Sequence, residues 1–563
     1  MSKRKLTTLS LLILIFTISF SLRFYQLGKI PNGISPDEAT IGYNAYSILK
    51  TGKDIYGENL PLFFQLFDSN VGGLTVYSLL PSIIAFGLSD FSIRVIPAAL
   101  GVVATIVMYL LTRSLYPKDK YISFISSLTF ALAPWSVAIS RAAFGHIDII
   151  LFYLLFLLFF VLSISKNRKF IFLSVLFLGL TLYIYLAGII YLLPLLIITG
   201  VIYRKELFKN MPVLIISIAI LFSIALPALK YYYSPNARTR LTSISVFTPE
   251  VTLPTSIAEI DYDQANGLPL SNIIHNRRLI YADELASNYL KYLNLDYLFV
   301  NAKDVRYFYI NYVGLFYFIE LPFFLFGLYW TIKRRTKSDL LILGLLLIGP
   351  LPAIITLGTA YPHRALLMLL AIQLISAVGI AKAFELFHGQ KKSMFSGIIY
   401  IGLPVIYAIN SLFFIHQYFI HVPREFSSEK DNGAWYSTVR DVIPFINQYG
   451  DNYQKIVFTQ TQPKLVPASY FLFYNKIDPK QFQESIGTLV KTNAPYQAIY
   501  SKVNNIEFRP INWQEDKNLK NALLIGYQRD FPKQTPNVVG KSYLPDGSVH
   551  FLFVSTQQNK FSK

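Results

Sequence analysis

Long apolar runs alternate with short polar segments over residues 1–420. A helix of about 20 apolar residues is long enough to cross the hydrocarbon core of a membrane. Read in this way, the sequence predicts eleven spans, at residues 6–23, 92–112, 121–138, 148–164, 170–187, 188–203, 211–229, 310–331, 339–357, 365–385 and 394–419. The pattern therefore predicts a polytopic α-helical membrane protein.

The Lys and Arg content of the connections predicts how these spans are oriented. Nineteen Lys and Arg residues lie in one set of segments, which comprises MSKRK, TRSLYPKDK, SKNRK, YRKELFKN, IKRRTKS and the ends of KAFELFHGQKK. The alternate connections SRAAFGH and GTAYPHR contain one Arg each. Because cytoplasmic loops carry the excess of basic residues, we expect a multi-pass protein of the cell (plasma) membrane with a cytoplasmic N-terminus. After eleven spans, the C-terminus would face outside.

Three segments on the expected outer side are too long to be simple turns. They are a first loop at about residues 24–91, a second loop at about 230–309 and a C-terminal tail from 421 to 563. Within the first loop, GLTVYSLLPSIIAFGL is apolar but short, and Pro81 interrupts it. We expect this segment to be an interfacial or re-entrant helix, because a further span would reverse the sidedness of every later connection.

The tail has the alternating pattern of a folded domain. QKIVFTQ, NALLIGYQ and SVHFLFVSTQ are typical of strands, and a PDG turn precedes the last of them. NGAWYSTVRDVIPFINQYG and LVPASYFLFYN are typical of helices. We therefore expect two domains, a transmembrane domain at 1–420 and a soluble extracytoplasmic α/β domain at 421–563.

The composition agrees with a membrane protein and excludes several other classes. Hydrophobic residues make up 53% of the 563 residues and charged residues only 15%, which is too apolar for a soluble chain of this size. The net charge of +19 comes from the basic connections, so we do not expect a nucleic-acid partner. The chain has no cysteine, which rules out disulfides and cysteine-ligated metal sites. It also has no glycine-rich nucleotide-binding motif.

Two adjacent carboxylates, Asp37 and Glu38, follow the first span in the stretch NGISPDEATIGYNAY. Ser35-Pro36-Asp37-Glu38 has the form of a capping box with proline at the first helical position, which accounts for Glu38 but leaves Asp37 as one of several acceptable residues. The alternative is a reactive carboxylate close to the membrane surface, where a general base is a standard role. The residues alone leave both interpretations open.

The ionisable residues of the short outer connections all lie at the mouth of a span. They are Arg141, His146, Asp148, His363 and Arg364. Arg and His side chains there can bind a phosphate, and charges near membrane depth indicate function. Each also has a structural interpretation: a headgroup anchor for Arg141, an interfacial histidine for His146 and a first-turn acid for Asp148. The structural interpretation is weakest for Arg364, because a cation at a helix start opposes the macrodipole.

The order of several blocks resembles the GT-C glycosyltransferases, in the branch that contains the protein O-mannosyltransferases and the bacterial lipid A aminoarabinose transferases. The blocks are SPDEATIGYNAYSILKTGKDIYGENLPLFF, PSIIAFGLSDFSIRVIPAALGVVATIVMYLLTR, RTRLTSISVF, NYLKYLNLDYLFVNAKDVRYFYINYVGLFYFIELPFFLFGLYW and YPHRALLMLLAIQLISAVGIAKAFE. The resemblance covers most of residues 1–420 in layout, which would make this part a GT-C-like catalytic domain. It does not extend to the tail.

This resemblance implies transfer of a sugar from a polyprenyl-phosphate-linked donor to an acceptor hydroxyl on the outer face of the membrane, with inversion. It makes Asp37 the general base and lets Glu38 orient the acceptor or assist the base. Arg364 is the first candidate for binding the donor phosphate, followed by His363 and Arg141. Further candidates for contact with substrate are Asp148, His146, Tyr43 and Tyr361. No cofactor is required; some GT-C members bind a divalent metal, but nothing in this sequence indicates one.

Two other functions remain open at this stage. A transporter or flippase for a lipid-linked sugar would also need a phosphate-binding arginine, but it should place polar residues near the centres of its spans. A membrane anchor that presents the tail would leave Asp37 without a role. The expected partners are membrane lipids, the polyprenyl-phosphate-linked sugar and an acceptor that is a lipid, a glycan or a protein.

Overall fold

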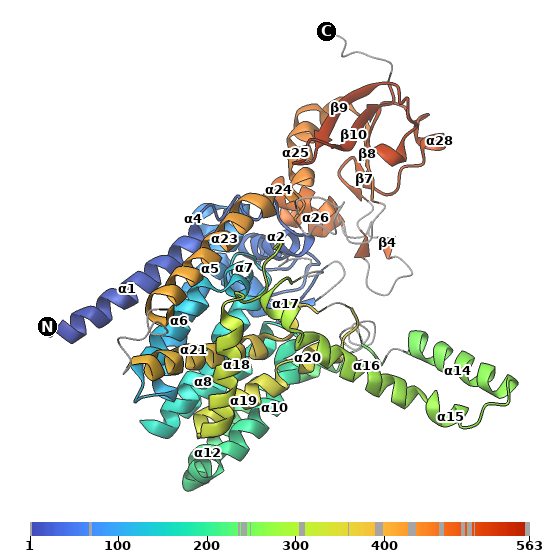
Figure 1. The fold of residues 1–563 in the computed structure, drawn as a ribbon. Helices are drawn as coiled ribbons and strands as arrows, with labels where there is room; N and C mark the ends of the chain where they lie inside the picture. Colours follow the sequence, from blue (N-terminus) through green and yellow to red (C-terminus); the bar gives the residue numbers. More distant parts are fainter. Residues whose placement is uncertain are drawn as a thin grey trace. The chain divides into compact units, whose positions relative to one another are not determined.

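The computed structural model describes most of the chain (Figure 1). The described residues are 3–66, 70–234, 237, 245–247, 249–302, 310–358, 360–388, 398–425, 435–460, 467–485, 490–491, 498–499 and 502–557. They form two compact units. The helical unit comprises Met1–Arg23, Ala99–Ser140 and Gly145–Phe414. The loop–tail unit comprises Phe24–Ala98, Arg141–Phe144 and Ile415–Lys563.

Seven helices among the described residues are long and apolar enough to cross a membrane. They are Leu6–Phe24, Asp90–Leu115, His146–Ser165, Arg204–Tyr232, Lys337–Ile354, Leu366–Leu386 and Tyr400–His421. Four shorter apolar helices lie at Gly73–Phe86, Lys120–Leu132, Phe170–Tyr183 and Ala187–Ile202. These helices agree with a polytopic helical membrane protein, whereas the predicted number of eleven spans is not confirmed.

Proline explains one difference between predicted and observed helices. The apolar run at 121–138 was expected to form one span, but α6 (Lys120–Leu132) ends before Pro134 and α7 (Pro134–Ile139) begins at it. A proline lacks the N–H needed inside a helix and restricts the residue before it. The run is therefore two short helices. The apolar segment around Pro81 likewise forms two short helices, α3 (Gly73–Ser78) and α4 (Leu80–Phe86).

The centre of the helical unit is α21 (Leu366–His388), which is almost entirely buried. It packs against α18 (Glu320–Arg334), α19 (Lys337–Ile348) and α6. The remaining described α-helices assigned wholly to this unit are α7, α8 (His146–Ser165), α9 (Phe170–Leu180), α10 (Ala187–Ile202), α11 (Arg204–Leu207), α12 (Met211–Tyr232), α14 (Pro249–Ala265), α15 (Ser271–Ile274), α16 (Arg277–Tyr292), α17 (Leu295–Phe299) and α20 (Leu351–Ile354).

Two glycines allow α18 and α21 to approach closely. A Cβ atom on Gly379 of α21 would lie 1.9 Å from the carbonyl oxygen of Phe323, and one on Gly327 of α18 would lie 2.0 Å from that of Ile375. Small residues are how helices reach backbone contact in membranes, where apolar surface alone gives no preference for a partner helix. The centre of the helical unit therefore depends on both glycines.

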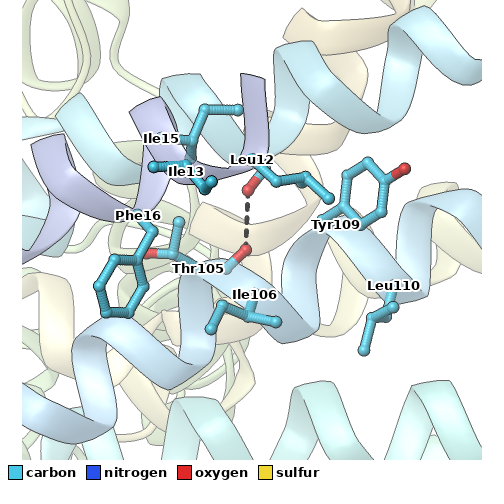
Figure 2. Close-up of a pocket in the computed structure, with 9 residues that line it drawn as sticks. Leu12, Ile13, Ile15, Phe16, Thr105, Ile106, Tyr109 and Leu110 are labelled. Atoms are coloured by element: carbon cyan, nitrogen blue, oxygen red, sulfur yellow. Dashed lines mark hydrogen bonds between the residues drawn. The ribbon is translucent and has the colours of Figure 1, made fainter. Parts of the chain in front are cut away.

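A cavity of about 270 Å³ lies between α1 (Lys3–Phe24) and α5 (Asp90–Leu115), with Ser127 of α6 also on its wall (Figure 2). Its other lining residues are Leu12, Ile13, Ile15, Phe16, Thr105, Ile106, Tyr109 and Leu110. The Ser127 hydroxyl donates to the Thr105 carbonyl oxygen, and no charged side chain lines the space. The cavity offers nothing that would bind a phosphate or act as a base.

The loop–tail unit begins with the first loop. After α2 (Pro36–Thr51), strands β1 (Phe63–Gln65) and β2 (Asn70–Gly72) form an antiparallel hairpin, which α3 and α4 follow. The helices of the tail are α24 (Val422–Glu425), α25 (Ser437–Tyr449), α26 (Pro467–Tyr474), α27 (Pro479–Ser485) and α28 (Trp513–Asp516). The helix α23 (Leu403–His416) precedes them.

The tail contains a six-stranded mixed sheet with the order β6-β7-β3-β8-β10-β9. Its strands are β3 (Lys455–Phe458), β6 (Lys502–Val503), β7 (Ile506–Phe508), β8 (Ala522–Tyr527), β9 (Val538–Tyr543) and β10 (Val549–Ser555). Strand β3 pairs in parallel with β7 and β8, and the other pairs are antiparallel. A separate short pair is formed by β4 (Val490–Lys491) and β5 (Ala498–Ile499). The three strands and two helices predicted for the tail are all present.

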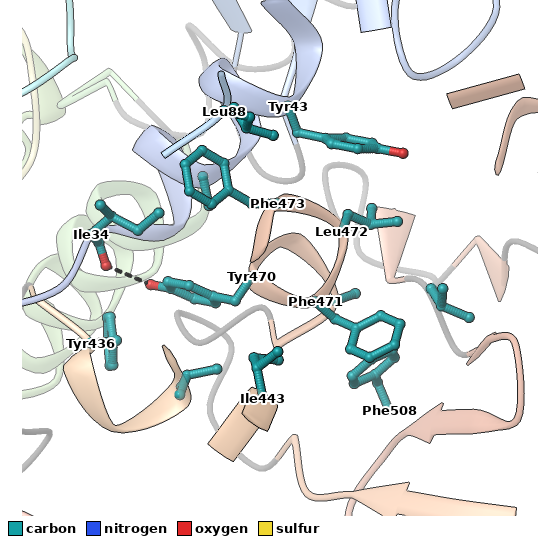
Figure 3. Close-up of a cluster of buried hydrophobic side chains, with 14 of the residues drawn as sticks. Ile34, Tyr43, Leu88, Tyr436, Ile443, Tyr470, Phe471, Leu472, Phe473 and Phe508 are labelled. Carbon is teal, nitrogen blue, oxygen red and sulfur yellow. Dashed lines mark hydrogen bonds between the residues drawn. The ribbon is translucent and has the colours of Figure 1, made fainter. Parts of the chain in front are cut away.

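The tail and the first loop share one hydrophobic core (Figure 3). Ile34, Tyr43 and Leu88 of the first loop lie in the same buried cluster as Tyr436, which precedes α25, and residues of α25, α26 and the sheet, among them Ile443, Tyr470, Phe471, Phe473 and Phe508. The tail, expected as a domain of its own at 421–563, is therefore packed around the first loop.

We predict that Gly379→Ala lowers the stability of the helical unit, because its methyl group would overlap the Phe323 backbone. Overpacking of this kind costs about 1–3 kcal/mol. The measurement is the apparent Tm of the purified protein in detergent. Gly200→Ala in α10 is the matched control, since a Cβ there meets nothing within 4 Å. Equal Tm values for the two variants would contradict the close approach of α18 and α21.

Candidate active site

The start of α2 has the capping box that the sequence predicts. The Glu38 N–H donates to Ser35 Oγ at 3.1 Å, and the Ser35 N–H donates to Glu38 Oε2 at 3.2 Å. Pro36 occupies the first turn, where its missing N–H is not needed. The local sequence therefore fixes where α2 begins.

Glu38 does more than cap the helix. Both side chains of the Glu38–Arg94 pair are fully buried, and Arg94 Nε and Nη2 donate to Glu38 Oε1 and Oε2 at 3.0 and 2.9 Å. The Ala143 N–H also donates to Oε1 at 3.0 Å. With the bond from Ser35, each carboxylate oxygen of Glu38 accepts two hydrogen bonds. These bonds make Glu38 a structural anchor, and its part in orienting the acceptor or assisting the base stays a prediction.

Arg94 extends this anchor to the segment that precedes α2. Its Nη1 donates to the Pro31 carbonyl oxygen at 2.9 Å, and its Nη2 donates to that of Gly33 at 2.7 Å. One guanidinium therefore holds both the backbone before α2 and the carboxylate inside its first turn. We call Glu38, Arg94 and the backbone groups that they bind the Glu38–Arg94 clamp.

Asp37 differs from its neighbours in exposure. In the run from Gly33 to Ala45, which is described throughout, Asp37 alone is partly exposed and every other residue is buried. It lies in the first turn of α2, between the capping residue and the clamp. Asp37 is thus a partly exposed residue directly beside a carboxylate that is enclosed.

Arg141 is held by protein groups. Its side chain is buried, and Nη2 donates to the carbonyl oxygens of Tyr25 and Ile30, each at 2.8 Å. The guanidinium also lies over the rings of Phe419 and Tyr418, at 4.9 and 5.7 Å from their centroids. These contacts favour the structural interpretation of Arg141 over the expected binding of a phosphate.

In the helical unit, two histidines predicted as site residues stack on each other. The rings of His146 and His363 are parallel within 8°, with their centroids 4.4 Å apart. Tyr361 stacks on His363 at 5.4 Å, and Tyr185 meets both histidines edge-on, at 5.2 and 6.0 Å. Burial lowers the pKa of His363 well below its usual value, and the nearby His146 and Arg364 lower it further. His363 is therefore neutral at physiological pH.

Arg364 keeps donors available for a ligand. Its Nη1 donates to Thr356 Oγ1 at 2.8 Å and to the Leu357 carbonyl oxygen at 3.0 Å, and the guanidinium lies 4.9 Å from the centre of the Tyr361 ring. The side chain is half-buried. Among acceptors in the described part of the chain, none takes a hydrogen bond from Nε or Nη2. Arg364 is thus a fixed guanidinium with free donors, which is what recognition of an anion requires.

Hydroxyl groups fix the backbone that carries His363 and Arg364. Tyr191 donates to the Arg364 carbonyl oxygen at 3.3 Å, and Tyr292 donates to that of Tyr361 at 3.2 Å. The segment η3 (Pro362–Arg364) leads from there directly into α21.

Two further candidates are buried. Asp148 lies in the first turn of α8, where its structural interpretation as a first-turn acid places it, and it is only 5% exposed. Tyr43 is 1% exposed, and its hydroxyl donates to the Ile477 carbonyl oxygen at 3.0 Å. Tyr43 is therefore a core residue, and its contact with substrate stays a prediction.

Sequence reasoning missed Arg94 and Tyr185. A signal for Arg94 was present, since it is a charged residue inside the predicted span 92–112, and such residues are retained for a partner or a function. Tyr185 carried no signal, because it is one aromatic residue in a long apolar run. No group of three or more His, Asp or Glu side chains that could hold a metal ion is found among the residues described.

We predict that Glu38→Gln strongly destabilises the protein, because it leaves the charge of Arg94 buried without its counter-ion. Breaking such a pair costs about 3–5 kcal/mol. The measurement is the apparent Tm in detergent. Glu206→Gln, which removes a carboxylate from the partly exposed pair with Lys337, is the control and should change the Tm little. An unchanged Tm for Glu38→Gln would contradict the structural role of the clamp.

Comparison with known proteins gives one family match. Residues 76–231 match the family described as dolichyl-phosphate-mannose-protein mannosyltransferase. No curated protein sequence matches the chain at a significant level.

Solved structures extend the likeness to the whole fold. The structure of ArnT from Cupriavidus metallidurans in the apo state superposes with a TM-score of 0.54 and 10% identity, covering 98% of each chain. The same protein bound to undecaprenyl phosphate gives a TM-score of 0.50 and 11% identity, covering 99% of each chain. The oligosaccharyltransferase from Archaeoglobus fulgidus gives a TM-score of 0.49 and 14% identity, and this chain spans 64% of its length. The chain is thus similar to the GT-C superfamily of membrane glycosyltransferases: residues 76–231 are similar in sequence, and the fold is similar to that of ArnT.

Proposed function

We propose that this protein is an inverting membrane glycosyltransferase that moves a sugar from a polyprenyl-phosphate-linked donor to an acceptor hydroxyl on the outer face of the membrane. The observation that carries the proposal is the partial exposure of residue Asp37 at the start of α2, next to the Glu38–Arg94 clamp. The likeness to ArnT, which binds undecaprenyl phosphate, supports a lipid-linked donor.

The proposed reaction is a single displacement. Asp37 accepts the proton of the acceptor hydroxyl as its oxygen attacks the anomeric carbon. The bond between that carbon and the phosphate oxygen breaks, and the lipid phosphate leaves with the electron pair. Attack from the side opposite the leaving group inverts the configuration. No further reactant is needed, because the bond between the sugar and the phosphate supplies the free energy of the transfer.

Arg364 is the proposed ligand of the donor phosphate. Its bonds to Thr356 and Leu357 and its packing over Tyr361 fix the guanidinium, which reduces the entropy lost on binding. Nε and Nη2, which bind no acceptor among the described residues, can bind two phosphate oxygens, the geometry for which arginine is suited. Because His363 is neutral, it can contribute to donor binding only by hydrogen bonding and ring packing. Arg364 supplies the positive charge that attracts the phosphate.

We predict that Asp37→Asn abolishes transfer and leaves the fold intact. An amide cannot accept the proton, and loss of a general base costs about 10²–10⁴-fold in rate. The capping box remains, so the Tm should change little. The measurement is acceptor-dependent release of polyprenyl phosphate from a panel of polyprenyl-phosphate sugars, with membrane extract as the source of acceptor.

Asp296→Asn is the control for this experiment, since Asp296 is another first-turn aspartate and is exposed. Full activity of Asp37→Asn would remove Asp37 from the reaction. Absence of release by the wild-type protein, with donor binding retained, would instead favour a transporter of lipid-linked sugars.

We predict that Arg364→Lys raises the Kd for polyprenyl phosphate by about tenfold or more, because an ammonium group lacks the two-pronged geometry of a guanidinium. Arg141→Lys should lower the Tm and leave this Kd unchanged, since the Arg141 guanidinium binds backbone carbonyl oxygens. Binding is measured with the purified variants in detergent or nanodiscs. A raised Kd in Arg141→Lys with an unchanged Kd in Arg364→Lys would make Arg141 the phosphate ligand instead of Arg364.

A further inference from the structure

The tail holds the backbone that leads into α2. The carbonyl oxygen of Ile34 accepts hydrogen bonds from the Tyr436 N–H at 3.3 Å and from the Tyr470 hydroxyl at 3.1 Å (Figure 3). Ile34 and Tyr470 are fully buried. Ile34 directly precedes the capping residue Ser35, so both bonds act one residue away from the start of the helix that carries Asp37.

Gly33 brings the tail into direct backbone contact with the same segment. Its φ of +86° favours glycine, and a Cβ atom there would lie 2.5 Å from the Ser437 nitrogen and 2.7 Å from the Tyr436 carbonyl carbon. Only a residue without a side chain allows the start of α25 to lie against the chain at this point. The tail is therefore closely fitted to the segment before α2.

A second set of contacts reaches the Glu38–Arg94 clamp. Arg440 of α25 donates from Nη2 to Asn32 Oδ1 at 3.2 Å, and its Nη1 lies 3.7 Å from Asp90 Oδ2. Asp90 begins α5, the helix that carries Arg94. The Trp435 ring faces the Arg94 guanidinium, with 5.3 Å between the ring centroid and Cζ. The tail thus contacts both the segment before α2 and the arginine that anchors it.

The body of α2 is held as well. Gly42 lies against Phe473, which a Cβ atom would approach to 2.7 Å. Gln483 Nε2 donates to Ser47 Oγ and Thr51 Oγ1, each at 3.1 Å, and to the Asp54 carbonyl oxygen at 2.8 Å. The tail therefore restrains α2 at its start and along its length.

We propose that the tail is a positioning element for Asp37, and that Tyr470 and Arg440 are its principal positioning residues. This inference rests on the proposed function, in which Asp37 is the general base. A base must be held close to its productive position, because a displacement of about 1 Å can cost about 10²-fold in rate. The hydrogen bonds to Ile34 and Asn32 fix the first turn of α2, and the tail acts on the reaction without touching substrate.

The test compares Tyr470→Phe with Tyr453→Phe in the full-length protein. Tyr470→Phe removes the bond to Ile34 and keeps the ring. Tyr453 is also a buried tyrosine of the tail, 5% exposed, and no hydrogen bond among the described residues joins its hydroxyl to the first loop. We expect Tyr470→Phe to lower kcat about tenfold with the KM for the donor unchanged, and Tyr453→Phe to keep the wild-type kcat. Rates are expressed per folded, monodisperse protein.

Arg440 gives a second, independent comparison. Arg440→Met should lower kcat, and Arg440→Lys, which keeps a cation near Asp90, should restore part of it. Wild-type kcat in Tyr470→Phe and Arg440→Met would overturn the inference, as would equal losses in Tyr470→Phe and Tyr453→Phe. If these results were found and Asp37→Asn were inactive, the positioning role of the tail would be overturned and the proposed function would stand. An active Asp37→Asn would overturn both the proposed function and the positioning role of the tail.

Discussion

The buried ion pair between Glu38 and Arg94 is the interaction on which the candidate site depends. Removing two charges from water is costly, and the attraction between them offsets this only when their remaining hydrogen-bonding capacity is also used. Here every oxygen of the carboxylate has two donors, and the guanidinium also binds two backbone carbonyl oxygens. The pair therefore holds together three chain segments: the start of α2 with the residues before it, the start of α5, and Ala143. In this arrangement Asp37 is the partly exposed residue of an otherwise buried run.

Adjacent carboxylates with opposite roles illustrate how environment assigns function. Glu38 is enclosed and fully bonded, so it is a fixed structural charge. Asp37 belongs to the same helical turn and is partly exposed, so the two adjacent acids lie in different environments. The two arginines Arg141 and Arg364, which the sequence predicts in outer connections, also differ in environment. Arg141 is bound to backbone and aromatic rings, while Nε and Nη2 of Arg364 bind no acceptor in the part of the chain that the structure describes.

Local patterns in the sequence predicted the parts of the fold that local physics determines. The S-x-x-E spacing predicted the start of α2, and alternating residues predicted β3, β8 and β10. The sequence could not distinguish Arg141 from Arg364, because each is a lone arginine at the mouth of a span and only distant partners separate them. It also could not reveal that Gly33 fits against Ser437 or that Tyr470 binds Ile34, since both contacts join segments that share no local pattern. Predicted helices failed where a proline inside an apolar run divided it, as at Pro134.

The shared core of the first loop and the tail has a consequence for biosynthesis. The Tyr470–Ile34 bond joins residues 436 positions apart, with the helices of the membrane part between them in the chain. A ribosome makes α2 early and α26 late, and domains fold only when all of their segments have emerged. The first loop must therefore wait, with apolar surface uncovered, until the last part of the chain is synthesised. Packing of the first loop, including α2 with Asp37, against the tail is consequently among the final events in maturation, and a prematurely terminated chain would insert into the membrane without it.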